Sequence, residues 1–228
     1  MNRLLPTDAA QYQRSSLHGE TRVWIETNCY VDLWIEVLHA CNYDPRAALA
    51  FTLSAEFEGE QWQFIKYPLE DLRSIYGIEV AELNPWRGLE YHIGEQLQRG
   101  QLLTAEVDAW FLPDTSGVSY QVEHVKTSIV VNAIDPVARS LGYFHGASYY
   151  ELCGPDYDGL LRTRGHADDV LPPYVERVRF EARPSDADRD DAARIAVAQH
   201  LGRRPAENPV RAMADRFNAD LEWLRPGG

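Results

Sequence analysis

The segment from Asn28 to Asp44, NCYVDLWIEVLHACNYD, limits what this chain can fold into more than any other part of it. Its apolar residues recur at helical spacing and form two adjacent rows, Cys29/Leu33/Val37/Cys41 and Tyr30/Trp34/Leu38. Two adjacent rows make one broad apolar face, and a helix with such a face packs into a protein core. We therefore predict a central helix that begins at Cys29, behind an Asn28 N-cap, and ends before Pro45.

The next stretch predicts further helices followed by strands. A second helix is expected from Pro45, because proline is tolerated in a first helical turn, and the aromatic run QWQFIKY predicts a short strand. Glycines at positions 77 and 100 are typical helix ends, and a strand is expected after each of them. The second of these strands, LLTAEVDAWFLP, ends at Pro113.

Two apolar runs joined by the turn PVARS predict a hairpin, with SIVVNAID in one arm and LGYFHGASYYEL in the other. Helices followed by an antiparallel sheet indicate an α+β domain, which we assign to residues 1–180. The composition then becomes polar and acidic, and two helices follow in DDAARIAVAQHLGR and PVRAMADRFNADLEWL. We assign residues 181–228 to a C-terminal helical extension packed on the first domain.

Composition excludes several function classes. The net charge of −13 provides no basic surface for nucleic acid. No apolar run is long enough for a transmembrane helix, and the start of the chain has no signal-peptide pattern. The 3 cysteines form neither a disulfide framework nor a zinc-ligand pattern. We expect a cytoplasmic protein that uses no nucleic acid, no membrane and no metal of its own.

Cys29 is the first candidate for chemistry, because it stands at a predicted helix N-terminus. A thiol acts as a nucleophile only when ionised, and a helix N-terminus favours the anion through its amide donors and dipole. The same amides can hold the oxyanion of an acyl-transfer intermediate. The alternative is a buried cysteine that packs as a small apolar side chain.

A cysteine nucleophile needs a histidine base that a third polar group orients. His124 directly precedes the first strand of the predicted hairpin. Asp135 and Asn132, at the end of that strand, are candidates to orient the ring, and His145 on the returning strand is a further one. Asp108 ends an apolar strand, where a charge needs a partner; it is expected to line the pocket, to bind a substrate amine or to cap the next loop.

The order of helix-borne cysteine, strand-borne histidine and acidic or amide group is that of papain-like enzymes. The stretch VDAWFLPDTSGVSYQVEHVKTSIVVNAID resembles the N-terminal domain of the butirosin-biosynthesis acyltransferase and papain-like, bacteriocin-processing peptidase-like domains. The segments ETNCYVDLWIE, FEGEQWQFIK and LGYFHGASYYEL also resemble a bacterial domain-of-unknown-function family associated with amino acid:carrier-protein ligases.

The resemblance implies a papain-like fold in which Cys29, His124 and Asp135 form the catalytic triad, with Asp135 preferred to His145 or Asn132. Papain-like proteases place a glutamine before the cysteine for the oxyanion hole. None stands in GETRVWIETN, so that role falls to Asn28, Thr27 or backbone amides.

The implied function is a cysteine-dependent acyltransferase with an acyl-enzyme on Cys29. It takes an (amino)acyl group from the phosphopantetheine thioester of an acyl or aminoacyl carrier protein, with an amino acid:carrier-protein ligase as a further partner. The alternatives are a papain-like peptidase or amidase, and a non-catalytic module that binds an aminoacylated carrier protein.

Overall fold

The computed structural model describes residues 1–19, 28–163 and 172–224. The chain divides into two compact units, which we call the sheet unit and the helical unit. The sheet unit contains Met1–Pro45 and Gly77–Arg183, and the helical unit contains Arg46–Tyr76 and Pro184–Gly228.

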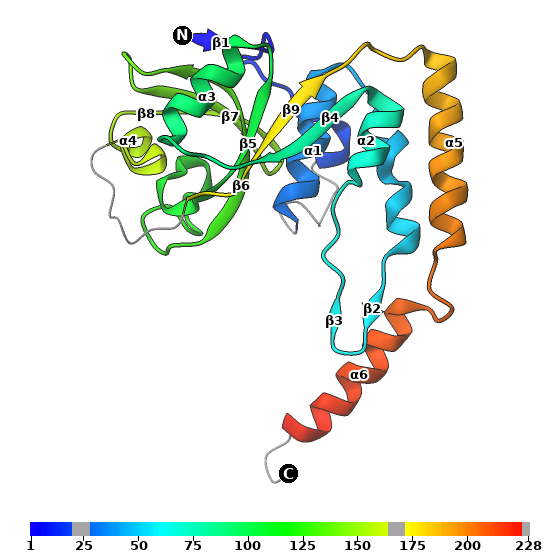
Figure 1. Cartoon of the computed structure of the whole chain (residues 1–228). Helices are drawn as coiled ribbons and strands as arrows, with labels where there is room; N and C mark the ends of the chain where they lie inside the picture. Colours follow the sequence, from blue (N-terminus) through cyan, green and yellow to red (C-terminus); the bar gives the residue numbers. More distant parts are fainter. Residues whose placement is uncertain (20–27, 164–171, 225–228) are drawn as a thin grey trace. The chain divides into compact units, whose positions relative to one another are not determined.

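The sheet unit is built on seven antiparallel strands in the order β4-β9-β5-β6-β7-β8, with β1 paired to β6 (Figure 1). The strands are β1 (Asn2–Arg3), β4 (Ile78–Leu83), β5 (Leu102–Asp108), β6 (Lys126–Asp135), β7 (Ser140–His145), β8 (Ser148–Cys153) and β9 (Val175–Phe180). This arrangement, with its helices, confirms the α+β class. The predicted second arm of the hairpin is two strands rather than one, because the chain turns at Gly146 with a φ of 49°.

The helices of this unit are α1 (Cys29–Ala40), α3 (Leu89–Gln98) and α4 (Pro155–Leu161), with short 3₁₀ turns η1 (Ser16–His18), η3 (Ala109–Phe111) and η4 (Pro113–Thr115). Helix α1 packs against β6, β7 and β8. Leu33, Trp34, Val37 and Leu38 are fully buried, so the predicted central helix is confirmed.

The helical unit contains η2 (Pro45–Ser54), the hairpin strands β2 (Phe57–Glu58) and β3 (Gln61–Trp62), α2 (Leu69–Tyr76), α5 (Asp186–Gly202) and α6 (Pro209–Leu224). The helix expected after Pro45 is a 3₁₀ helix. The Thr52 and Ser54 hydroxyls donate to the carbonyls of Leu49 and Phe51, three residues back, at 2.7 and 2.9 Å. These bonds compete with a regular α-helical pattern.

Residues 46–76 belong with the C-terminal helices rather than with the rest of residues 1–180. The physical reason is packing, because α2 lies against α5 and strand β2 lies against α6. In the part of the chain that the structure describes, no helix has the length and apolarity needed to cross a membrane.

Candidate functional site

Cys29 is the first residue of α1, as the sequence predicts. The Asn28 side-chain oxygen accepts the Val31 amide at 3.1 Å, and the Asp32 carboxylate accepts the Asn28 amide at 3.4 Å. These two bonds cap the first turn and fix where the helix begins. The Cys29 side chain is half-buried at this terminus.

His124 is held by Asp108, a residue from the neighbouring strand. The ring nitrogen Nδ1 of His124 lies 2.6 Å from Asp108 Oδ2, and the imidazole stacks on Trp110 with ring centroids 4.5 Å apart. Asp108 Oδ1 accepts the Trp110 amide at 3.0 Å, so one carboxylate positions both rings. No described residue bonds Nε2 of His124, whose side chain is 68% exposed. With Nδ1–H donated to the carboxylate, Nε2 can accept a proton.

The start of α1 and Asp108 lie on the same face of the sheet. Residues directly opposite each other on antiparallel strands point to one face. Glu176 on β9 is opposite Thr104 on β5, and Asp108 follows Thr104 by four residues, so all three share a face. The hydroxyl of Tyr30 donates to Glu176 Oε2 at 2.9 Å, which anchors the first turn of α1 over that face.

This shared face brings Cys29 and His124 to one side of the sheet, with an offset along the strand. Four residues of strand span ~13 Å, which is the offset between Thr104 and Asp108. Among the described residues no hydrogen bond joins the Cys29 thiol to His124.

Asp135 does not reach His124. It ends β6, whereas His124 precedes the first residue of that strand, and a ten-residue strand spans ~30 Å. The Asp135 carboxylate instead accepts the amides of Val137 and Ala138 at 3.1 and 2.9 Å. The Ala138 amide and the Met1 amine, 2.9 Å away, hold the pKa of this carboxyl below its ordinary value. The carboxylate that orients His124 is therefore Asp108, which corrects the triad drawn from the sequence.

His145 lies on the opposite face of the sheet from Asp108. Its Nε2 contacts the Thr127 hydroxyl at 2.9 Å, and Thr127 is opposite Val107, the neighbour of Asp108 on the other face. Its Nδ1 contacts Asp114 at 2.5 Å. Both ring nitrogens are thus occupied on the far face, and His145 cannot orient His124.

Asn132, also a predicted site residue, has a structural role. Its side-chain oxygen accepts the Leu5 amide at 2.7 Å, and its amide donates to the Leu5 carbonyl at 3.1 Å. These two bonds tie the start of the chain to β6. Thr27, considered for the oxyanion hole, lies outside the described residues.

A buried histidine cluster beneath α1 was missed at the sequence level. His18 Nδ1 lies 2.5 Å from Glu36 Oε1, and its Nε2 lies 3.3 Å from Asp32 Oδ1. Burial lowers the pKa of His18, but the hydrogen bonds that its ring donates to Asp32 and Glu36 outweigh burial and raise the pKa to about 9. The sequence did hold one indication of this cluster. Asp32 and Glu36 stand four residues apart in an apolar helix, and buried charges need partners.

A second buried histidine occurs in the helical unit. His200 Nε2 lies 2.8 Å from Asp71 Oδ2, and its Nδ1 lies 3.1 Å from the Ser54 hydroxyl. That hydroxyl also bonds the Phe51 carbonyl, so every member has a partner. These hydrogen bonds link η2, α2 and α5, so we assign the cluster a structural role.

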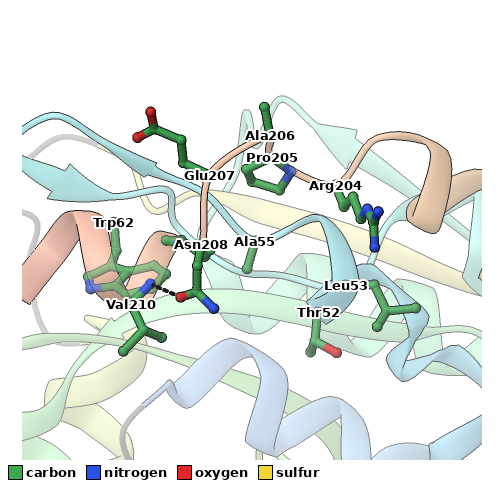
Figure 2. A pocket seen from close by; sticks show the side chains of 11 residues that line it. Thr52, Leu53, Ala55, Trp62, Arg204, Pro205, Ala206, Glu207, Asn208 and Val210 are labelled. Atoms are coloured by element: carbon green, nitrogen blue, oxygen red, sulfur yellow. Dashed lines mark hydrogen bonds between the residues drawn. The ribbon is translucent and has the colours of Figure 1, made fainter.

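The turn between α5 and α6 forms a hollow of about 680 Å³ against η2 and β3 (Figure 2). Leu53, Trp62 and Val210 contribute apolar walls, and Arg204 and Glu207 contribute charges. Within the described residues, no group of three or more His, Cys, Asp or Glu side chains could hold a metal ion.

Comparisons with known proteins identify two adjoining family models. The DUF1839 N-terminal domain matches residues 13–180, and the DUF1839 C-terminal domain matches residues 186–227. Two threonine–tRNA ligases of Bifidobacterium longum, strains DJO10A and NCC 2705, are 28% and 27% identical over 107 residues. That stretch covers 45% of this chain and only 16% of each ligase. A match to so small a part of the ligases does not indicate ligase activity. No solved structure matches.

Proposed function

We propose that this chain, which belongs to the DUF1839 family, is a cysteine-dependent acyltransferase with a papain-like arrangement. Its nucleophile is Cys29, and its base is His124, oriented by Asp108. The observation that carries the proposal is the His124–Asp108 hydrogen bond of 2.6 Å, on the same sheet face as the helix terminus that bears Cys29.

In the first half-reaction, Nε2 of His124 takes the thiol proton of Cys29, and the sulfur attacks the carbonyl carbon of a thioester. The carbon–sulfur bond of the donor breaks, and the departing thiolate takes the proton back from His124. The second half-reaction repeats this sequence with an amine or hydroxyl acceptor, which attacks the acyl-enzyme. Thiol–thioester exchange is close to thermoneutral, so the protein has only to position groups and move a proton.

Asp108 acts on the base rather than on the acyl group. By accepting Nδ1–H, it holds the tautomer that leaves Nε2 as proton acceptor, and it stabilises the imidazolium that forms. Backbone amides in the first turn of α1 are the proposed oxyanion donors. The Asn28 side-chain oxygen is engaged as the helix cap, so Asn28 contributes by fixing that turn.

The proposed donor is an aminoacyl group on the phosphopantetheine arm of a carrier protein, supplied by an amino acid:carrier-protein ligase. A long, flexible arm suits this site, because the donor thioester has to reach between a helix terminus and a strand end. The proposal requires the Cys29 sulfur and His124 Nε2 to come within hydrogen-bond reach when the donor is bound.

Incubation with an aminoacyl carrier protein, followed by intact-mass measurement, tests the proposal. The expected result is a covalent aminoacyl adduct that maps to Cys29 and disappears in Cys29→Ser. Cys153→Ser, at an exposed cysteine, is the matched control and keeps the adduct. Absence of the adduct in the wild type, or an adduct that survives in Cys29→Ser, would refute the proposal. Release of free amino acid from a Cys29 adduct, without an acceptor, would indicate a hydrolase.

A further inference from the structure

Helix α6 carries an apolar row with little cover. Val210, Met213, Phe217 and Leu221 are spaced by three and four residues, which places them on one face of the helix. Their exposed fractions are 63%, 41%, 56% and 39%. Apolar rows at this spacing are normally buried against another element.

The β2–β3 hairpin covers only one flank of α6. Trp62 Nε1 donates to the Met213 sulfur at 3.2 Å, and Glu60 lies 3.4 Å from Arg216. Phe217 still exposes on the order of 100 Å², because an aromatic side chain buries roughly 150–250 Å² when covered. With Val210, Met213 and Leu221 added, the area enters the range of roughly 300–600 Å² typical of functional apolar patches.

We infer that this row is the interface between two copies of the chain, with α6 packed antiparallel against α6 of the second copy. The row has the symmetry that such a pair requires. Met213 and Leu221 stand four residues before and after Phe217, so a two-fold axis at Phe217 pairs Met213 of each copy with Leu221 of the other. A two-fold interface needs one patch that is complementary to itself, and this row meets that condition.

The charges beside the row fit the same arrangement. Arg216 and Asp220 form an ion pair of 3.0 Å along one flank. In the antiparallel pair, residue 220 of the second copy lies level with residue 214 of the first, about 3 Å along the axis from Arg216. Each arginine then stands between two aspartates, one from each copy. A parallel pair would instead set Arg216 level with Arg216.

Site-specific disulfide formation tests the geometry. In a background of Cys29→Ser, Cys41→Ala and Cys153→Ser, the variant Phe217→Cys is expected to form a disulfide-linked dimer under mild oxidation at least tenfold faster than Val210→Cys. The reason is that residue 210 of one copy lies ~21 Å along the axis from residue 210 of the other. Equal rates for the two variants would overturn the antiparallel pair.

Sedimentation of the otherwise unaltered chain provides a second measurement that needs no cysteine replacement. The wild type is expected to show a concentration-dependent dimer, and Phe217→Glu is expected to be monomeric. Val137→Glu, at a side chain that is 96% exposed in the sheet unit, is the matched control and keeps the dimer. A wild type that stays monomeric at all concentrations, or a Phe217→Glu variant that still dimerises, would overturn the inference.

Discussion

Replacing His18 with glutamine should alter the pH dependence of stability in a way that the buried cluster dictates. His18 is fully buried between Asp32 and Glu36, and its pKa is raised from 6.5 to about 9. A group whose pKa is higher in the folded state stabilises the fold by binding its proton more tightly there. That contribution is fully present below pH 6.5 and is lost as the pH rises through about 9.

The magnitude follows from the shift in pKa. A rise of about 2.5 units corresponds to about 3 kcal/mol, because each unit is worth about 1.4 kcal/mol. Between pH 6.5 and pH 10 the wild type should therefore lose about 3 kcal/mol of unfolding free energy that the His18→Gln variant never had. The difference in stability between the two proteins should shrink by that amount over this range.

Urea unfolding of both proteins at a series of pH values measures this difference, and the titrating groups away from the His18–Asp32–Glu36 cluster cancel because both proteins contain them in the same surroundings. His39→Gln is the matched control. His39 is in α1, the helix that carries Asp32 and Glu36, and its ring bonds the Gln13 carbonyl at 3.1 Å rather than a carboxylate, so its variant should keep the wild-type pH slope. A wild-type advantage over His18→Gln that stays constant from pH 6.5 to pH 10 would refute the reasoning.

Two further predictions concern the cysteines and the candidate site. Asp108→Ala should slow acylation of Cys29 at least tenfold, because Asp108 contacts His124. Asp135→Ala should lower the melting temperature and leave the acylation rate unchanged, because its carboxylate bonds the Val137 and Ala138 amides instead. Time courses of Cys29 acylation compare the two variants, and a larger effect of Asp135→Ala on the rate would restore the triad predicted from the sequence. Partial burial raises the pKa of the half-buried Cys41 thiol to about 12, so iodoacetamide at pH 8 should spare Cys41 until urea unfolds the protein. Peptide mapping checks this, and labelling of Cys41 in the folded protein would contradict the raised pKa.

Local signals in the sequence were enough to locate several elements. The start of α1 was predictable from Asn28, because the cap bond to Val31 is made within one turn. The end of α2 was predictable from Gly77, which adopts a φ of 67° that favours glycine. Both features depend on residues that are neighbours in the chain.

Long-range pairings were harder to predict. The sequence favoured Asp135 as the partner of His124 because both flank one strand, yet the two ends of a strand are its most distant points. Asp108 ends the preceding strand and is opposite Lys126, so an antiparallel connection brings it next to His124. That register depends on strand pairing, which residue types alone did not reveal.

Buried clusters and packing partners could not be predicted from local sequence patterns either. His18 contacts Asp32 and Glu36 only after the lead-in segment folds against α1. Residues 46–76 join the C-terminal helices because α2 packs on α5, more than 100 residues later in the chain. Neither contact has a local sequence pattern that specifies it.

The most direct test of the central claim is the order in which limiting iodoacetamide alkylates the cysteines at neutral pH, read by peptide mapping. If His124 activates the thiol at the start of α1, Cys29 should react first, ahead of the exposed Cys153. Both His124→Ala and Asp108→Ala should remove most of that preference. Equal labelling of Cys29 and Cys153 in the wild type, or a preference for Cys29 that survives the loss of His124, would contradict the proposal that Cys29 and His124 act together.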